Sequence, residues 1–409
     1  MATRIEDSIT RERPADDWTD FVHTGPGTLA GRYLRRFWQP VARSQDLPPG
    51  RAYPLRVMSE DLTLYRGEAG APHLLAFRCA HRGTQLSTGW VEGDDLRCFY
   101  HGWKYGPTGQ CLEQPAEPAP FCERIAIRAY PTEEYLGLIF AYLGEGAPPP
   151  LPRYPELEAD GLQIVETYSW PCNFFNTLDN DPIHGAFVHR KPGLPRGVFY
   201  YPRVSARETD WGMEERRVWA DGEYRISQKG MPNVHYNMRN PNGDPESGWL
   251  EDISWMVPMD DDRFVKFAVL LAHLSGEAAA RYLERRTERF AKMTVPAEGL
   301  AEEILAGRRE IEEVNQLRAW QGAWTQVTNV QDYVTQVGQG RIADHSIEHL
   351  GQTDVTVILF RNLWQRELRA LAEGRPLKEW QRTADVAASC SEHASNSEDH
   401  LPVAGAAVV

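Results

Sequence analysis

The sequence predicts an α+β protein in which an all-β domain comes first and a larger domain of strands and helices follows. Two observations predict this order. Short strand-like runs separated by glycine and proline fill residues 41–145, as in "LTLYRG" and "YLGLIFAYLG". Beyond about residue 276, charged residues are mixed with apolar residues that recur at helical spacing, as in "GEAAARYLERRTERFAKM". Strand-like runs such as "RFVKFAVLL" precede those helices, so the second domain is expected to be mixed.

A proline-rich segment marks the expected boundary between the two domains. "EGAPPPLPRYPELE", from Glu145 to Glu158, favours an extended chain. The expected organisation is an N-terminal segment that packs on the second domain (1–37), an all-β domain (38–148), the larger domain (149–380) and a tail (381–409). The tail, "RTADVAASCSEHASNSEDHLPVAGAAVV", is small and polar, which predicts disorder.

Several helices can be placed from their end signals. "PGTLAGRYLRRFWQP" predicts a short helix that starts near Thr28 and stops at Pro40. "TDVTVILFRNLWQRELRALAEGRP" predicts a longer helix with Thr353 as the N-cap and Gly374 as a stop. "PCNFFNTLDNDPIHGAFVHRK" is also expected to be helical.

The overall charge argues against some classes of protein. The chain of 409 residues carries 44 basic and 58 acidic residues, for a net charge of −14, whereas a nucleic-acid binder needs a basic face. The charged N-terminus does not resemble a secretory signal, and the apolar run "FVKFAVLLAHL" is too short to span a bilayer. We therefore expect a cytoplasmic protein that binds neither nucleic acid nor membranes, with reduced cysteines.

Two cysteine–histidine pairs lie close together in the all-β region. Cys79 is followed by His81, and Cys98 is followed by His101. Two cysteines and two histidines hold either a tetrahedral zinc ion or a [2Fe–2S] cluster with two thiolates on one iron and two imidazoles on the other. A zinc finger usually groups its cysteines before its histidines, whereas here each loop offers one of each. The order therefore favours the iron–sulfur cluster, with zinc as the competitor.

A second histidine pair occurs in the larger domain. His184 and His189 would lie roughly 140° apart on an ideal helix, so they share one metal only if the helix ends or distorts between them, which Gly185 permits. Two histidines and a distant carboxylate make the facial triad of non-haem Fe(II) oxygenases, which leaves positions open for O₂. From spacing alone, a helix with two solvated histidines explains the pair equally well.

Both patterns together resemble a known family. "CAHRG" followed by "CFYHGWKY" resembles the Rieske signature, in which Gly83, Gly102, Trp103 and Tyr105 match the residues that shape the loops. A Rieske motif followed by Asp-x-x-His-x4-His resembles the α subunits of Rieske non-haem iron aromatic oxygenases, over roughly residues 25–375. The likeness is strongest to the phthalate-dioxygenase-like branch, which has α subunits only, and within it to the 5,5'-dehydrodivanillate O-demethylase oxygenases.

The resemblance assigns the metal ligands. It implies that Cys79, His81, Cys98 and His101 bind the Rieske cluster, and that His184 and His189 bind a mononuclear Fe(II). The segment "NVQDYVTQVGQG" matches the one that carries the third iron ligand, which would be Asp332. Asp344, in "IADHSIEHLG", is the second choice.

One further carboxylate is implied to act between subunits. Asp181 matches the residue that bridges the Rieske histidine of a neighbouring subunit to an iron-ligand histidine. A local interpretation competes, because Asp181 followed by Pro182 looks like a helix N-cap with proline at the first position. Asp179, two residues upstream, is easily mistaken for it.

The resemblance also implies the architecture and the partners. The second domain is expected to be a helix-grip fold, with an antiparallel sheet flanked by helices. The subunits are expected to form a head-to-tail homotrimer in which electrons cross between subunits. A separate NAD(P)H-dependent reductase is expected, and the chain has no glycine-rich dinucleotide fingerprint of its own.

The implied function is that of a terminal oxygenase that uses O₂ on an aromatic small molecule. The resemblance favours O-demethylation of a methoxylated, lignin-derived aromatic. The alternative within enzymes is ring hydroxylation of a phthalate-like aromatic carboxylate. From another class, a Rieske electron-transfer protein without oxygenase activity would need no second iron site, so Asp181, His184, His189 and Asp332 argue against it.

Overall fold

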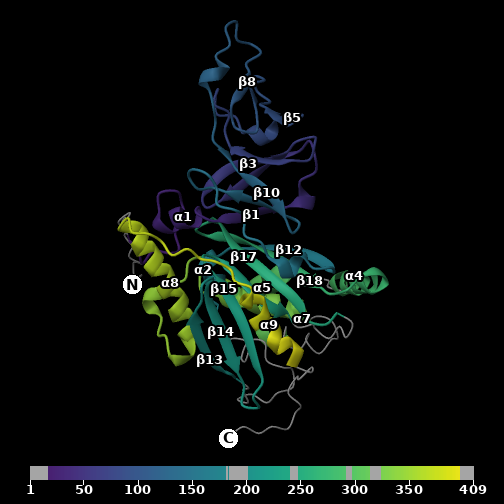
Figure 1. The fold of residues 1–409 in the computed structure, drawn as a ribbon, viewed down its shortest axis with the longest axis vertical. Helices are drawn as coiled ribbons and strands as arrows, with labels where there is room; N and C mark the ends of the chain where they lie inside the picture. The colour runs from purple at the N-terminus through teal and green to yellow at the C-terminus, as the bar shows by residue number, and fades with distance from the viewer. Residues whose placement is uncertain are drawn as a thin grey trace, which may run out of the picture.

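The chain folds into two domains that differ in size and architecture. The computed structural model describes residues 17–180, 183, 201–239, 247–291, 297–313 and 324–396. In Figure 1 a β domain stands above a larger domain that is built around one wide sheet with helices beside it. Antiparallel sheets and helices are both present, so the predicted α+β class is confirmed.

Three small antiparallel sheets make up the N-terminal domain. Their strand orders are β1-β11-β10, β2-β3-β4-β9 and β5-β6-β7-β8. The β5–β8 sheet lies at the tip farthest from the large sheet (Figure 1). The strands are β1 (Trp38–Arg43), β2 (Ala52–Val57), β3 (Glu60–Arg66), β4 (Pro72–Ala76), β5 (Trp90–Glu92), β6 (Asp95–Arg97), β7 (Lys104–Tyr105), β8 (Cys111–Glu113), β9 (Ala129–Tyr130), β10 (Thr132–Tyr135) and β11 (Leu138–Tyr142).

A tight turn attaches this domain to the next one. Val57 pairs with Glu60, so Met58 and Ser59 form a two-residue hairpin turn, and both have positive φ, 47° and 63°. Their two N–H groups each donate, over 2.8 Å, to carbonyls of β17, those of Pro258 and Met259. The turn that closes β2 and β3 is thereby bonded to the backbone of the larger domain.

The larger domain is organised by a seven-stranded antiparallel sheet. Its order is β12-β18-β17-β16-β15-β14-β13. The long central hairpin pairs β17 with β18, and the sheet ends in the β13–β14 hairpin at the other edge. The strands are β12 (Leu162–Trp170), β13 (Arg203–Glu208), β14 (Gly212–Val218), β15 (Tyr224–Gly230), β16 (Val234–Arg239), β17 (Leu250–Asp260) and β18 (Arg263–Ala272).

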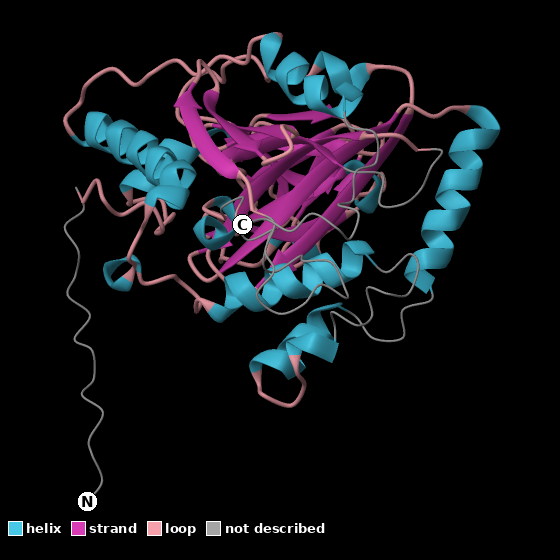
Figure 2. Cartoon of the chain, turned by 90° about the horizontal axis from the view of Figure 1, so that it is seen from below, coloured by secondary structure: helices cyan, strands magenta, loops and turns pink. Residues whose placement is uncertain are grey.

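The helices lie around this sheet, as Figure 2 shows from below. The α-helices are α1 (Leu29–Leu34), α2 (Phe174–Leu178), α4 (Gly276–Ala291), α5 (Ala297–Leu305), α7 (Trp324–Gly338), α8 (Val355–Ala372) and α9 (Asp385–Asn396). The 3₁₀ helices are η1 (Ser44–Asp46), η2 (Leu86–Thr88), η3 (Cys122–Arg124), η4 (Pro155–Glu158), η5 (His345–Ile347) and η6 (Gln352–Asp354).

The two faces of the large sheet have different characters. Side chains that pair across antiparallel strands share a face. On one face Trp255 packs edge-on against Phe140 and Tyr154, at centroid distances of 5.4 and 5.6 Å, and so joins the core of the N-terminal domain. The opposite face is polar, with Lys229, His235, Ser254, Ala268 and Glu166 in one row across five strands.

The starts of α1 and α8 lie at or next to the residues that the capping signals predicted, whereas α1 ends at Leu34, well before the predicted stop at Pro40. Thr28 caps α1, as predicted, and accepts a hydrogen bond from the Gly31 N–H. The N-cap of α8 is Asp354 rather than Thr353, one residue later than predicted, and Gly374 follows the helix with a φ of 66°.

The predicted disordered tail contains a helix. Residues 385–396 form α9, which lies against β15 and β16. Val386 and Cys390, four residues apart, are both buried, and Gln228 donates to the Ser389 hydroxyl over 3.0 Å. The expectation of disorder considered only helix propensity, which is low for small polar residues. The helix is instead stabilised by tertiary packing, because its narrow apolar stripe is buried against the sheet.

Candidate functional site: the cluster loops and the polar face of the sheet

The two cysteine–histidine loops at the tip are closed by the same pattern of backbone hydrogen bonds. The Cys79 N–H donates to the Thr84 carbonyl, and the Cys98 N–H donates to the Trp103 carbonyl, each over 2.8 Å and each spanning five residues. One loop follows β4 and the other follows β6, and the two loops face each other. This explains why the two pairs of ligands recur at short range in the chain.

A glycine closes each loop in the same way. The Gly83 N–H donates to the Cys79 carbonyl over 2.9 Å, and the Gly102 N–H donates to the Cys98 carbonyl over 3.1 Å. Both glycines have a φ of 74°, which side chains with a Cβ adopt only at a cost. The family resemblance had marked both glycines as loop-shaping residues, and the turn geometry gives the physical reason.

An arginine also supports each loop, which the sequence analysis missed. Arg78 donates to the Gly83 carbonyl over 2.9 Å, and Arg97 donates to the Gly102 carbonyl over 2.8 Å. Each of them comes directly before a predicted ligand cysteine. The repeated dipeptide Arg-Cys in "FRCAHRG" and "LRCFYHG" is therefore the sequence signal that could have identified these arginines. Glu113 holds Arg97 in place across 2.8 Å.

The loops bring the four predicted cluster ligands together. Cys79 and Cys98 are buried, and the rings of His81 and His101 face each other with centroids 4.5 Å apart. Trp103 stacks on His81 at 4.6 Å, which fixes the plane of that ring. His81 Nδ1 is buried without a hydrogen-bond partner, although buried polar atoms usually have one. Binding to a metal would satisfy that nitrogen.

The donor set fits a Rieske cluster. The four ligands divide into two thiols and two imidazoles, as a cluster with two chemically different irons requires. Each loop supplies one thiol and one imidazole, which matches the division of ligands between the two irons of such a cluster.

Tyr105 reaches one of the cluster sulfurs. Its hydroxyl lies 3.2 Å from Cys79 Sγ and accepts the Ala80 N–H over 3.0 Å. Burial is the main cause that raises the pKa of Tyr105, so this hydroxyl keeps its proton. When the cysteine is a thiolate, only the hydroxyl can donate. Hydrogen bonds to the sulfurs are one of the factors that set the reduction potential of such clusters.

Most of the predicted mononuclear iron site lies outside the described residues. Asp181, His184 and His189 all fall there, so they stay predictions. Asp332 is described and lies half-buried in α7. Burial is the main cause that raises the pKa of Tyr168, and the charge of Asp332 acts in the same direction, so Asp332 lies near the polar face of the sheet. Asp344, the second choice, caps η5 and accepts the Ser346 N–H over 3.0 Å.

The chain just before Asp181 is held firmly. Asn173 caps α2, which ends at Leu178. Lys229, from β15, donates to the carbonyls of Leu178 and Asn180 over 2.9 and 3.1 Å. Leu178 and Asn180 are thereby bonded to a side chain of the polar face of the sheet.

Asp179 has a structural partner rather than a free carboxylate. Arg361 of α8 donates from Nε to Asp179 Oδ2 over 2.8 Å. Burial raises the pKa of Asp179 to about 6, while Arg361 acts to lower it. This ion pair ties α2 to α8 and distinguishes Asp179 from Asp181, the residue assigned to the bridge.

The polar face carries an unusual number of cations around a neutral histidine. Burial, and then Lys229, Lys266 and Arg217, hold the pKa of His235 well below its usual range, so the imidazole is uncharged at neutral pH. Arg239 lies on the same face and is paired with Asp252 at 2.7 Å. This face lies opposite α7, because Trp170 of β12 contacts Tyr333 with ring centroids 5.6 Å apart.

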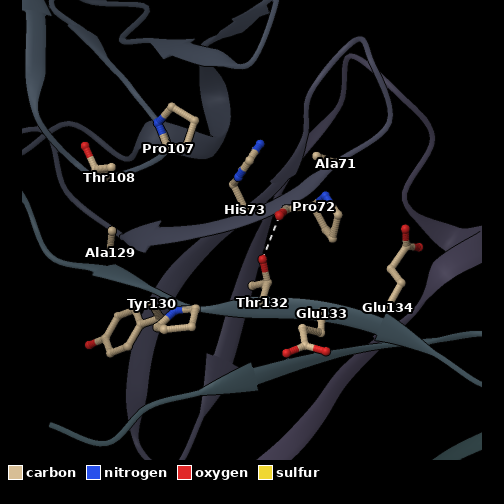
Figure 3. A pocket seen from close by; sticks show the side chains of 11 residues that line it. Ala71, Pro72, His73, Pro107, Thr108, Ala129, Tyr130, Thr132, Glu133 and Glu134 are labelled. Carbon is tan, nitrogen blue, oxygen red and sulfur yellow. Dashed lines mark hydrogen bonds between the residues drawn. The ribbon is translucent and has the colours of Figure 1, made fainter. Parts of the chain in front are cut away.

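A groove lies elsewhere, on the N-terminal domain. Its volume is about 520 Å³, and it is lined by β4, β9 and β10 (Figure 3). His73 points into it, and Thr132 donates to the Pro72 carbonyl over 2.6 Å across its floor (Figure 3). The groove contains no predicted site residue.

In the described part of the chain, no helix combines the length and the apolar character that crossing a membrane requires.

Comparisons with known proteins agree with this geometry. Residues 37–131 match the Rieske [2Fe-2S] domain family. The chain is 32% identical to the phenoxybenzoate dioxygenase subunit alpha of Ectopseudomonas oleovorans, over 85% of this chain and 84% of that protein. It is 28% identical to the 5,5'-dehydrodivanillate O-demethylase oxygenase subunit of a Sphingobium species, over 87% of this chain and 81% of that one.

Solved structures share the fold at lower identity. NdmA of Pseudomonas putida CBB5, in a mutant form with theobromine, superposes with a TM-score of 0.60 at 19% identity, covering 86% of this chain and 98% of that one. The terminal oxygenase of carbazole 1,9a-dioxygenase from Novosphingobium sp. KA1 gives 0.59 at 18% identity, covering 90% and 97%. Together with the paired cluster loops, these relationships place the chain among the α subunits of Rieske non-haem iron aromatic oxygenases.

Proposed function

We propose that this α subunit O-demethylates a methoxylated, lignin-derived aromatic compound. The pair of matched loops, with their two thiols and two imidazoles, supports the Rieske cluster, and the likeness to oxygenase subunits over most of the chain carries the oxygenase assignment. When bound, the cluster supplies single electrons, and the mononuclear iron supplies O₂ activation. The demethylation itself is supported by the likeness, over most of both chains, to an O-demethylase oxygenase subunit.

The reaction balances as a monooxygenation. One oxygen atom of O₂ enters a methyl C–H bond of the methoxy group, and the other leaves as water with two electrons and two protons. The resulting hemiacetal breaks its C–O bond and releases formaldehyde and a phenol. The electrons come from NAD(P)H through a separate reductase.

A homotrimer in the cytoplasm is part of the proposal. Trp90, Phe99, Tyr100 and Phe121 surround the cluster loops with their rings exposed, and Trp90 and Phe99 touch at a centroid distance of 5.5 Å. An aromatic surface next to a redox centre suits contact with another protein. We assign it to the neighbouring subunit and the electron donor. The six cysteines are free, which fits a reducing compartment.

One finding favours a second candidate. The relative with 32% identity is a dioxygenase subunit named for phenoxybenzoate, which supports ring hydroxylation of an aromatic carboxylate. The same iron site serves either reaction, because the pocket decides which carbon is presented.

Product analysis separates the two candidates. With reductase, NADH and O₂, a methoxybenzoate such as vanillate is expected to yield one formaldehyde and one phenol for each O₂ consumed. Benzoates without a methoxy group are expected to turn over poorly. If phthalate-like acids instead give cis-diols while methoxyarenes only convert O₂ into peroxide, ring hydroxylation is the function.

A further inference from the structure

Two cysteines beside the cluster loops have no role in the predicted cluster. Cys111 lies in β8 and is buried in the small core that also contains the predicted ligands Cys79 and Cys98. Cys122 begins η3 and lies half-buried against the same core. Both are free thiols. The N-terminal domain therefore places a second pair of cysteines next to the pair that is expected to bind iron.

Hydrogen bonds hold the two segments that carry these cysteines side by side. The Cys111 N–H donates to the Ile125 carbonyl over 2.9 Å. The Gln110 side-chain amide donates to the Cys122 carbonyl over 2.7 Å and also reaches the Cys111 carbonyl, at 3.3 Å. One side chain thus binds the backbone of both cysteines. The loop between them, residues 112–121, is closed at its base by these contacts.

The two thiols meet at this junction. Burial is the main cause that raises the pKa of Cys111 to about 12, and a hydrogen bond with the Cys122 side chain acts in the same direction. A disulfide requires two cysteines whose backbones are already near each other and whose side chains point together. The fold provides both conditions, because Gln110 holds the backbones and the side chains are in contact.

Cys111 connects the pair to a predicted thiolate ligand. It pairs with Tyr105 across β7 and β8, and the Tyr105 hydroxyl lies 3.2 Å from Cys79 Sγ. Side chains at paired positions of antiparallel strands are close neighbours. A shift of Cys111 is therefore passed to the residue that touches the ligand sulfur.

Cys122 connects the pair to a predicted imidazole ligand. The residue before it, Phe121, packs edge-on against Trp103 with ring centroids 5.5 Å apart. Trp103 in turn stacks on His81 at 4.6 Å. A bond between the two cysteines therefore joins a support of each kind of ligand.

We propose that Cys111 and Cys122 are a redox-active pair that hydrogen peroxide converts reversibly into a disulfide, and that this bond changes the surroundings of the Rieske cluster. Peroxide forms when O₂ takes up two electrons and two protons but no oxygen reaches a substrate. An oxygenase that lacks its proper substrate is exposed to this oxidant. The inference does not depend on which substrate is oxidised.

The chemistry takes two steps that balance. The half-buried Cys122 is the sulfur that peroxide reaches first; its attack breaks the O–O bond, gives a sulfenic acid and releases one water. The Cys111 sulfur then attacks the sulfenic sulfur, the S–S bond forms, and the hydroxyl leaves as a second water with the proton of Cys111. Two thiols and one H₂O₂ thus give one disulfide and two waters.

Mass spectrometry of one tryptic peptide tests the pair. Cleavage after Lys104 and Arg124 gives residues 105–124, which contain both cysteines and none of the predicted metal ligands. The metal-loaded protein is treated anaerobically with one equivalent of H₂O₂, and free thiols are alkylated before digestion. This peptide is expected to lose both alkylation sites and to become two hydrogen atoms lighter than its reduced form. Dithiothreitol is expected to restore both sites.

Two variants and a spectrum extend the test to the cluster. After the same treatment, Cys122→Ser is expected to keep an alkylatable thiol at Cys111. Cys172→Ala is the matched control, because it removes a buried cysteine of the larger domain and should form the disulfide as wild type does. Visible circular dichroism of the oxidised cluster is expected to change on treatment of wild type and Cys172→Ala, and to stay the same in Cys122→Ser.

Several results would overturn the proposal. They are a peptide that keeps both alkylation sites, loss of the cluster absorbance before the disulfide forms, oxidation of Cys122 to a sulfinic acid without a disulfide, and a product that dithiothreitol does not reduce. All four come from wild type, so they decide the question even where a variant fails to fold. A disulfide that leaves the circular dichroism unchanged would overturn the effect on the cluster.

Discussion

At the scale of single residues, the cluster loops show how little sequence is needed to specify a redox site. Each loop consists of an arginine, a cysteine, a histidine and a glycine, and each residue has one physical task. The glycine permits the turn, the arginine caps its carbonyl, and the other two present their donor atoms. Tyr105 is the residue that breaks the symmetry, because it contacts the sulfur of Cys79.

The Tyr105 hydroxyl is expected to raise the reduction potential of the cluster. Its hydrogen bond stabilises the more negative, reduced state, so Tyr105→Phe should lower the potential by about 40 mV, which corresponds to about 1 kcal/mol. A redox titration followed by EPR measures this. Tyr65→Phe is the control, because Tyr65 lies in the same small core but donates to the Asp94 carbonyl, away from the sulfurs. Equal potentials in both variants would show that the hydroxyl has no tuning role.

Asp332 is expected to be the carboxylate ligand of the mononuclear iron. Asp332→Ala should reduce the iron content from three atoms per chain to about two, because the cluster keeps its own ligands and only the single iron is lost. Asp344→Ala should keep all the iron, since Asp344 caps η5. Metal analysis together with the visible spectrum of the cluster measures both variants. Loss of iron from Asp344→Ala alone would exchange the two assignments.

At the scale of elements, α9 is the clearest case in which tertiary packing decides what local sequence does not. Its side chains give a weak helical signal, and Val386 and Cys390 are turned into the core. The apolar run "RFVKFAVLL" of β18 and the periodicity and end signals of α8 are strong, so the sequence predicted these two elements. The end of the short α2 is bonded to Lys229 and Arg361, and both of those partners come from distant parts of the chain.

Removal of α9 is therefore expected to destabilise the larger domain. Truncation after residue 384 exposes β15 and β16 and loses the burial of Val386 and Cys390, which should lower the free energy of unfolding by about 3 kcal/mol. Truncation after residue 396 keeps the helix and serves as the control. Urea denaturation compares the two proteins. If both unfold at the same midpoint, the contacts of α9 contribute nothing to stability.

At the scale of the whole molecule, the sequence predicted the α+β class and the two cysteine–histidine loops that the structure brings together, because both depend on local patterns; that these four residues bind the cluster stays a prediction. The polar face could not be predicted, since the cross-strand register alone brings Arg217 next to Arg225. The same register puts His235 and Arg239 on the polar face and Trp255 on the opposite, apolar face, which the strand sequences alone do not show.

The proposed head-to-tail trimer makes a prediction about mixed assemblies. Cys98→Ser subunits lack the cluster, and Asp332→Ala subunits lack the single iron, so each is expected to be inactive alone. If electrons cross between subunits, coexpressed mixtures should regain activity, because an intact cluster then neighbours an intact iron. Random assembly in a ring makes about a quarter of the interfaces productive, so about a quarter of wild-type turnover is expected. Complete inactivity of the mixture would place electron transfer within one chain.

The turn at Met58 and Ser59 has a further consequence for thermal unfolding of the protein. The two N–H groups of this turn donate to carbonyls of β17, so backbone hydrogen bonds join the small β domain to the large sheet. Trp255 and Phe140 add a common apolar core across the same junction. Unfolding of the large sheet therefore removes contacts that hold the domain with the Rieske cluster. Loss of the cluster's visible absorbance on heating is expected to follow unfolding of the larger domain, and not only damage to the cluster itself.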